Sequence, residues 1–115
     1  MNLLDLEDEK LKNVNINGKN FKIRFISPRD RISIAQKRAS FQGGLPFESF
    51  PEQDLILFDN IAVVDVCTEE FPTGINSSES CGNWDDGELI NNLANEIRKH
   101  TADFEAKLKK NRPLT

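Results

Sequence analysis

The sequence predicts an α+β fold that is mostly α-helical, with about three helices after an N-terminal β-hairpin. Two observations favour this class. Residues 14–25 alternate apolar and polar side chains around an Asn-Gly pair, which is typical of a hairpin. Residues 28–110 then contain three long apolar patterns separated by loops rich in Gly, Pro and Ser.

The length of 115 residues fits one domain. We expect a flexible acidic arm at 1–12, a single globular domain at 13–112 and a short tail at 113–115. A hydrophobic content of 37% and a charged content of 30% are typical of a soluble globular protein. No apolar run is long enough to span a membrane. Because MNLLDLEDEK also lacks the features of a signal peptide, we expect a cytoplasmic location.

The hairpin is centred on Asn17 and Gly18, two residues that tolerate a positive φ. If they form a two-residue loop, Val14 lies opposite Phe21 on one face. The apolar face would then cover the core and the basic side chains would point outward.

A first helix is expected to follow the hairpin. Ser27 is a good N-cap, Pro28 suits the first helical position, and Asp30 occupies the acidic position of a capping box. Gly43-Gly44 ends the helix. Its apolar side chains at helical spacing are Ile32, Ala35 and Ala39, widened by Ile34 and Phe41.

The loop LPFESFP, residues 45–51, has two readings. Phe47 and Phe50 can fold back onto the core, which is the reading we favour. Alternatively they form an exposed apolar docking loop.

Pro51 opens a segment that reaches Glu70 without an internal Gly or Pro. Its length favours a helix that is apolar nearly all round and therefore buried. A strand over residues 61–67 is the alternative, because β-branched residues cluster there. The helical pattern consists of Leu55, Phe58, Ala62 and Val66.

The last helix is expected from about Asp86 to Lys110. We place the N-cap at Asp85 and the acid of a capping box at Glu88, with Trp84 in the position that packs against the first turn. The acidic stretch is too compact for a calcium loop. The apolar stripe contains Leu89, Leu93, Ile97, Phe104 and Leu108, with Thr101 at the missing step.

Catalytic and cofactor signatures are missing from the sequence. Cys67, Cys81 and His100 match no zinc spacing. A disulfide between the two cysteines is not expected in a reducing compartment, and His100 is expected to be a solvated helix residue. There is no phosphate-binding loop and no nucleophile motif. We therefore expect no enzyme activity, no cofactor and no metal.

Charge is strongly segregated along the chain. Residues 18–38 carry seven bases and one acid, whereas residues 39–97 carry twelve acids and no base. Such blocks can pair with one another across the fold, or they can face a partner of opposite charge. Internal pairing is the reading we favour for most of them.

The order of these features resembles a known family. A strand runs into a basic helix, IRFISPRDRISIAQKRASFQGG, and a buried helix ends near EEFPTG. A Trp-Asp-Asp stretch then opens a terminal amphipathic helix with a late Phe, ADFEAKLKKNR. Over roughly residues 20–112 the chain resembles the small tail assembly chaperones of long-tailed bacteriophages and prophages.

The resemblance implies a non-enzymatic role in an infected bacterial host. Proteins of this family bind the helical, apolar tape measure protein and keep it soluble until tail-tube subunits surround it. Many exist in a short form and a frameshifted long form, between which the sequence does not decide. Because the core is small, a homo-oligomer is also plausible. The family brings no catalytic residues.

A chaperone for a long helix needs an apolar groove rimmed by charge. The candidate partner-binding residues lie near the Gly-Gly turn: apolar Ile32, Ala35, Ala39, Leu45, Phe47 and Phe50, and basic Arg31, Lys37 and Arg38. Each apolar one can instead belong to the core.

Two other functions stay open. The basic residues of 18–38 could bind nucleic acid, but the net charge of −4 and the absence of tyrosine do not favour it. The chain could also be a tail-completion or connector subunit that remains in the virion.

Overall fold

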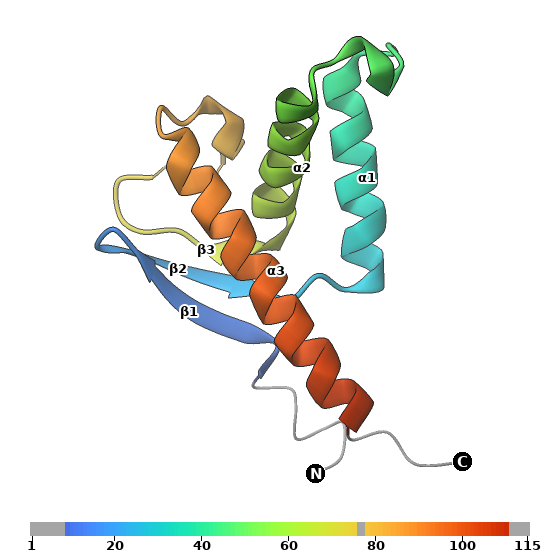
Figure 1. Cartoon of the computed structure of the whole chain (residues 1–115). Coiled ribbons are helices and arrows are strands. Elements are labelled where there is room, and N and C mark those ends of the chain that lie inside the picture. The colour runs from blue at the N-terminus through green and yellow to red at the C-terminus, as the bar shows by residue number, and fades with distance from the viewer. Residues whose placement is uncertain (1–8, 76–77, 111–115) are drawn as a thin grey trace.

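The structure is a computed structural model that describes residues 9–75 and 78–110 (Figure 1). Residues 1–8 of the expected arm at 1–12, and the expected tail at 113–115, lie outside the described residues. The α+β class, with an N-terminal hairpin and three α-helices in the described part, is confirmed. In chain order the elements are β1 (Leu11–Ile16), β2 (Lys19–Arg24), α1 (Pro28–Gln42), the 3₁₀ turn η2 (Phe47–Ser49), α2 (Glu52–Cys67), β3 (Thr68–Glu70), the 3₁₀ turn η3 (Cys81–Asn83) and α3 (Gly87–Lys110).

The hairpin forms as predicted. β1 and β2 are antiparallel, and Val14 pairs with Phe21. Asn17 and Gly18 have φ values of 54° and 83°, as a two-residue hairpin turn requires. The strand starts earlier than expected, because Leu11 already pairs with Arg24. Residues 11 and 12 therefore belong to the folded domain and not to the arm.

The open question over residues 61–67 is answered in favour of the helix, since α2 runs to Cys67. The prediction missed β3, which follows α2 immediately. It pairs antiparallel with β2 through Thr68 and Glu70, giving the sheet order β1-β2-β3. A strand of three residues leaves no alternation to detect, and its partner lies far away in the sequence.

α3 crosses one side of the sheet, and α1 and α2 extend beyond it (Figure 1). α2 packs against both α1 and α3, and α3 also packs against β1 and β2. The core is apolar and continuous across these contacts. Its largest fully buried side chains are Phe21, Ile23, Leu93, Ile97, Val64, Cys67 and Cys81.

Two predictions about α3 are wrong. The N-cap is Asp86, one residue after the predicted Asp85. The helix begins at Gly87, and the Leu89 N–H donates to the Asp86 carboxylate at 3.1 Å. His100 is buried and not solvated, with its Nε2 3.0 Å from the Lys10 carbonyl oxygen. Lys10, just before β1, covers His100, and the apolar pattern of the helix alone does not predict this burial.

Both cysteines are free thiols buried in the core. Trp84 lies beside η3 and packs against the hairpin side of the core. Its ring is edge-on to Phe71, with centroids 6.0 Å apart, and tilted towards Phe21 at 6.3 Å. Trp84 therefore joins the loop before α3 to β2 and the segment after β3.

Candidate partner-binding groove

A groove lies between α1 and α3, with α2 as its floor. Both walls pack against α2 and diverge from each other (Figure 1). The groove has a volume of about 500 Å³. The residues that line this α1–α3 groove are Ile26, Arg31, Ile34, Ala35, Arg38, Asp59, Val63, Arg98, Thr101, Ala102 and Glu105.

A second hollow of about 590 Å³ adjoins the first near the loop between α1 and α2, and we call it the tip groove. Both hollows are lined by Arg38, Asp59 and Arg98, so these side chains stand where the two meet. The remaining lining of the tip groove is Gln42, Phe47, Glu52, Leu55, Ile56 and Asn60.

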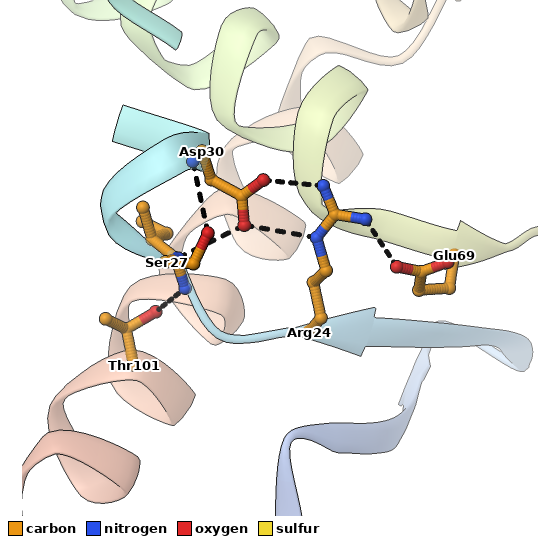
Figure 2. Close-up of polar contacts among 6 residues, drawn as sticks. Arg24, Ser27, Asp30, Glu69 and Thr101 are labelled. Atoms are coloured by element: carbon orange, nitrogen blue, oxygen red, sulfur yellow. Dashed lines mark hydrogen bonds and ion pairs between the residues drawn. The ribbon is translucent and has the colours of Figure 1, made fainter. Parts of the chain in front are cut away.

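Thr101, which lines the α1–α3 groove, links the start of one wall to the other. Its hydroxyl accepts the backbone N–H of Ile26 at 2.8 Å (Figure 2). The same hydroxyl donates to the Ile97 carbonyl at 2.8 Å. Because Ile26 lies just before α1, its hydrogen bond to Thr101 fastens the start of α1 to α3. Without this acceptor the buried N–H of Ile26 would be unpaired, which would destabilise the fold.

The first turn of α1 is fixed by the predicted capping box. The Ser27 hydroxyl accepts the Asp30 N–H, and the Asp30 carboxylate accepts the Ser27 N–H, each at 3.1 Å. Arg24 at the end of β2 also donates to Asp30 at 2.7 and 3.1 Å and to Glu69 of β3 (Figure 2). One bidentate pair thus joins the sheet to the helix that forms the groove wall.

The same contacts shift the pKa values of Asp30 and Arg24. Burial alone would raise the pKa of Asp30, but the hydrogen bonds from Arg24 and Ser27 outweigh it, so this pKa lies below its ordinary value. Hydrogen bonds to Asp30 and Glu69 raise the pKa of Arg24 against an opposing effect of burial. Both groups are therefore charged at neutral pH.

Ion pairs cross the groove between its walls. Arg31 on α1 lies 3.0 Å from Glu105 on α3, with both side chains largely exposed. Asp59 on α2 pairs with Arg38 of α1 at 2.9 Å and with Arg98 of α3 at 2.5 Å. These contacts place charge at the rim and, through Asp59, on the floor of the groove beside Val63.

The structure brings four of the nine candidate binding residues to the grooves. Arg31, Ala35 and Arg38 line the α1–α3 groove, and Phe47 lines the tip groove. The others have different surroundings. Ile32, Ala39 and Leu45 are exposed outside both linings, and Phe50 packs edge-on against Phe58 with ring centroids 5.3 Å apart.

Lys37 does not form part of the rim. Its ammonium group lies 3.4 Å from Asp65, a buried carboxylate on α2. Asp65 also accepts the Ser80 hydroxyl and the Cys81 N–H, so it fastens η3 to α2. Lys37 therefore offsets a buried charge.

The favoured reading of the loop is wrong for Phe47, whose exposed fraction is 58%. Phe50 is half-buried against Phe58, outside the core cluster. The expectation that α2 is buried all round is also wrong at its start. Asn60–Val64 and Cys67 are buried, but Ile56 is 54% exposed. α1 and α2 extend together beyond the sheet (Figure 1), so the start of α2 has fewer neighbours.

Sequence reasoning missed Asp59, Arg98 and the apolar residues Val63, Leu55 and Ile56 as groove residues. Arg98 and Glu105 are seven residues apart on one helix, which places them on one face. That spacing was the available signal, but it does not show that α1 lies opposite.

Most of the basic block is paired within the chain. Five of the seven bases of residues 18–38 form ion pairs. These pairs are Lys22–Glu70, Arg24–Asp30, Arg31–Glu105, Lys37–Asp65 and Arg38–Asp59. The segregated charges thus meet across the fold, as the favoured reading expected.

No family model, no curated protein and no solved structure matches this chain. In residues 9–75 and 78–110, no helix has the length and apolar character needed to cross a membrane. Within the same residues, no cluster of three or more His, Cys, Asp or Glu side chains is placed to hold a metal.

Proposed function

We propose that this protein is a non-enzymatic binding module that holds an apolar helical segment of another protein in its two adjoining grooves. The observation that supports this is the exposure of Phe47 and Ile56 beside the junction residues Arg38, Asp59 and Arg98. Large apolar side chains exposed beside a charged rim are typical of sites where an amphipathic helix docks.

The dimensions fit such an occupant. The α1 residues that line the two grooves run from Arg31 to Gln42, a length of ~17 Å at 1.5 Å per residue. A groove along this wall can contact about three turns of a helix. Together with the resemblance of the sequence, this favours a phage tail assembly chaperone whose partner is the tape measure protein.

Nucleic-acid binding is the weaker candidate. Binding to phosphates needs cations that are free to exchange with counterions, whereas five of the seven bases in the basic block already pair with acids of the same chain. A connector subunit of the virion is distinguished by location: a chaperone is absent from finished particles, whereas a connector remains in them.

The test is co-expression with the proposed partner, a tape measure protein, followed by size-exclusion chromatography at low and high salt. We expect a complex that persists at high salt, because apolar contacts are not screened. The double variant F47S/I56S should lose the partner. The matched control is I32S, because Ile32 is 62% exposed on α1 but lines neither groove.

Two results would contradict the proposal. One is a chain that elutes alone and retains nucleic acid only at low salt. The other is a complex that F47S/I56S and I32S weaken equally, because the partner would then bind elsewhere.

A further inference from the structure

The carboxylate of Asp59 accepts hydrogen bonds from two arginines where the two grooves meet. Arg38 donates to Asp59 Oδ1 at 2.9 Å, and Arg98 donates to Asp59 Oδ2 at 2.5 Å. Within the described residues, each guanidinium makes this one hydrogen bond to an acid. A guanidinium has five N–H donors, so both arginines keep donors for a further acceptor.

The local charge is positive although the chain as a whole is negative. Three arginines and two carboxylates line the α1–α3 groove. Arg31 and Glu105 neutralise each other, which leaves Arg38 and Arg98 with Asp59 and an excess charge of about +1. Glu52 lies in the tip groove, so the excess faces the α1–α3 groove.

Both arginines are accessible to a ligand. The side chains of Arg38 and Arg98 are 47% and 37% exposed. Beside them the groove presents Ile34, Ala35 and Val63. A ligand that uses the whole groove therefore combines one negative group with an apolar body.

We propose that Arg38 and Arg98, which both pair with Asp59, form a carboxylate-binding site. The occupant is an Asp or Glu side chain on the apolar face of the partner helix. The identity of this occupant rests on the proposed function, but the existence of the site does not. Planar guanidinium groups suit a carboxylate, which can accept two parallel hydrogen bonds.

The site itself is tested without a partner. Hexanoate is the probe, and hexanamide, its uncharged amide analogue, is the control. In an NMR titration we expect hexanoate to shift the side-chain Nε–Hε signals of Arg38 and Arg98, and hexanamide to leave them unchanged. Arg29 is the internal reference, because it is exposed on α1 and lines neither groove. Equal shifts at Arg29, or equal shifts with hexanamide, would overturn the site.

Two substitutions should act in opposite directions. R98Q removes one guanidinium and should weaken hexanoate binding about tenfold or more. D59N releases both arginines and should strengthen it severalfold. Unfolding cannot raise the affinity for hexanoate. The D59N result therefore tests the proposal even if R98Q does not fold. Weakened binding by D59N would contradict the proposal.

The occupant is tested in the complex. Glutamine replaces, one at a time, each Asp or Glu on the apolar face of the partner segment that binds. One such change should weaken the complex as much as R98Q does, and the two together should cost less than their sum.

The outcomes separate the two proposals. If the complex forms and neither R98Q nor D59N changes its affinity, the proposed function stands and the acidic occupant is refuted. Hexanoate binding without any complex supports the site but refutes a partner helix as its occupant.

Discussion

The hydroxyl of Thr101, on the last helix, accepts the backbone N–H of Ile26 at 2.8 Å, although 75 residues separate them in sequence. This bond fastens the chain just before α1, one wall of the α1–α3 groove, to α3, the other wall. Replacing Thr101 by the isosteric Val removes the acceptor and leaves a buried N–H unpaired. We expect T101V to lower the free energy of unfolding by about 1–3 kcal/mol.

The measurement is urea denaturation followed by circular dichroism. T101S keeps the hydroxyl and should lose clearly less stability than T101V. Equal losses in the two variants would show that the methyl group matters and the hydrogen bond does not.

Asp30 should make stability depend on pH in the acidic range. Its folded pKa lies below its ordinary value because Arg24 and Ser27 hydrogen-bond the carboxylate more strongly than burial disfavours it. The unfolded value is about 3.9. The contribution is therefore fully present above about pH 4 and is lost as pH falls through the folded pKa.

The test compares urea midpoints of the wild-type chain, D30N and D85N at pH 7 and pH 3. We expect D30N to lower the free energy of unfolding at pH 7 by about 1–3 kcal/mol. It should also lose less stability on acidification than the other two chains. D85N is the control, because Asp85 is exposed. An unchanged acid dependence in D30N would refute the role of this carboxylate.

The two thiols should be unreactive in the folded chain. Burial raises the pKa of Cys67 to about 12, and it also raises the pKa of Cys81. At pH 8 only about one Cys67 in ten thousand is then a thiolate, which is the reactive form. With an aromatic disulfide reagent we expect slow labelling in buffer and rapid reaction of both thiols in urea. Rapid labelling of either thiol in buffer would contradict its burial in the core.

Trp84 should contribute to stability, whereas the exposed Phe47 should not. W84A removes a ring that packs against Phe71 and Phe21, and we expect a loss of about 2 kcal/mol because the residue is only partly buried. W84F should lose less. F47A is the control, with an expected change within about 0.5 kcal/mol. A larger effect of F47A than of W84A would reverse the assignment of core and binding surface.

Features decided within a few residues were predictable. The Asn17-Gly18 turn and the Ser27–Asp30 capping box form as expected, because their hydrogen bonds and backbone angles are local. The helical choice for α2 was also correct. The length of the segment without Gly or Pro indicated the helix, but it did not indicate that the helix ends at Cys67 and is followed by β3.

Features that depend on distant contacts were not predictable. β3 exists because β2 offers it a partner, and His100 is buried because the chain before β1 covers it. The apolar spacing of α1 allowed several buried faces. Packing against α2 buries Ile34 and leaves Ile32 in solvent.

The candidate site was predictable only in part. The sequence indicated Arg31, Arg38 and Phe47 near a surface that could bind a partner. It did not indicate that Lys37 is used to neutralise the buried Asp65, or that Arg98 joins Arg38 at Asp59.

By itself the sequence determined the kind and order of the main elements, because turn chemistry, capping and apolar periodicity act over short stretches of chain. Only the tertiary structure decided which helix faces are covered and which charges are paired, because those outcomes depend on what each element packs against. A groove is a property of two walls and a floor. Here α1, α2 and α3 supply them, and no one of these segments specifies the groove alone.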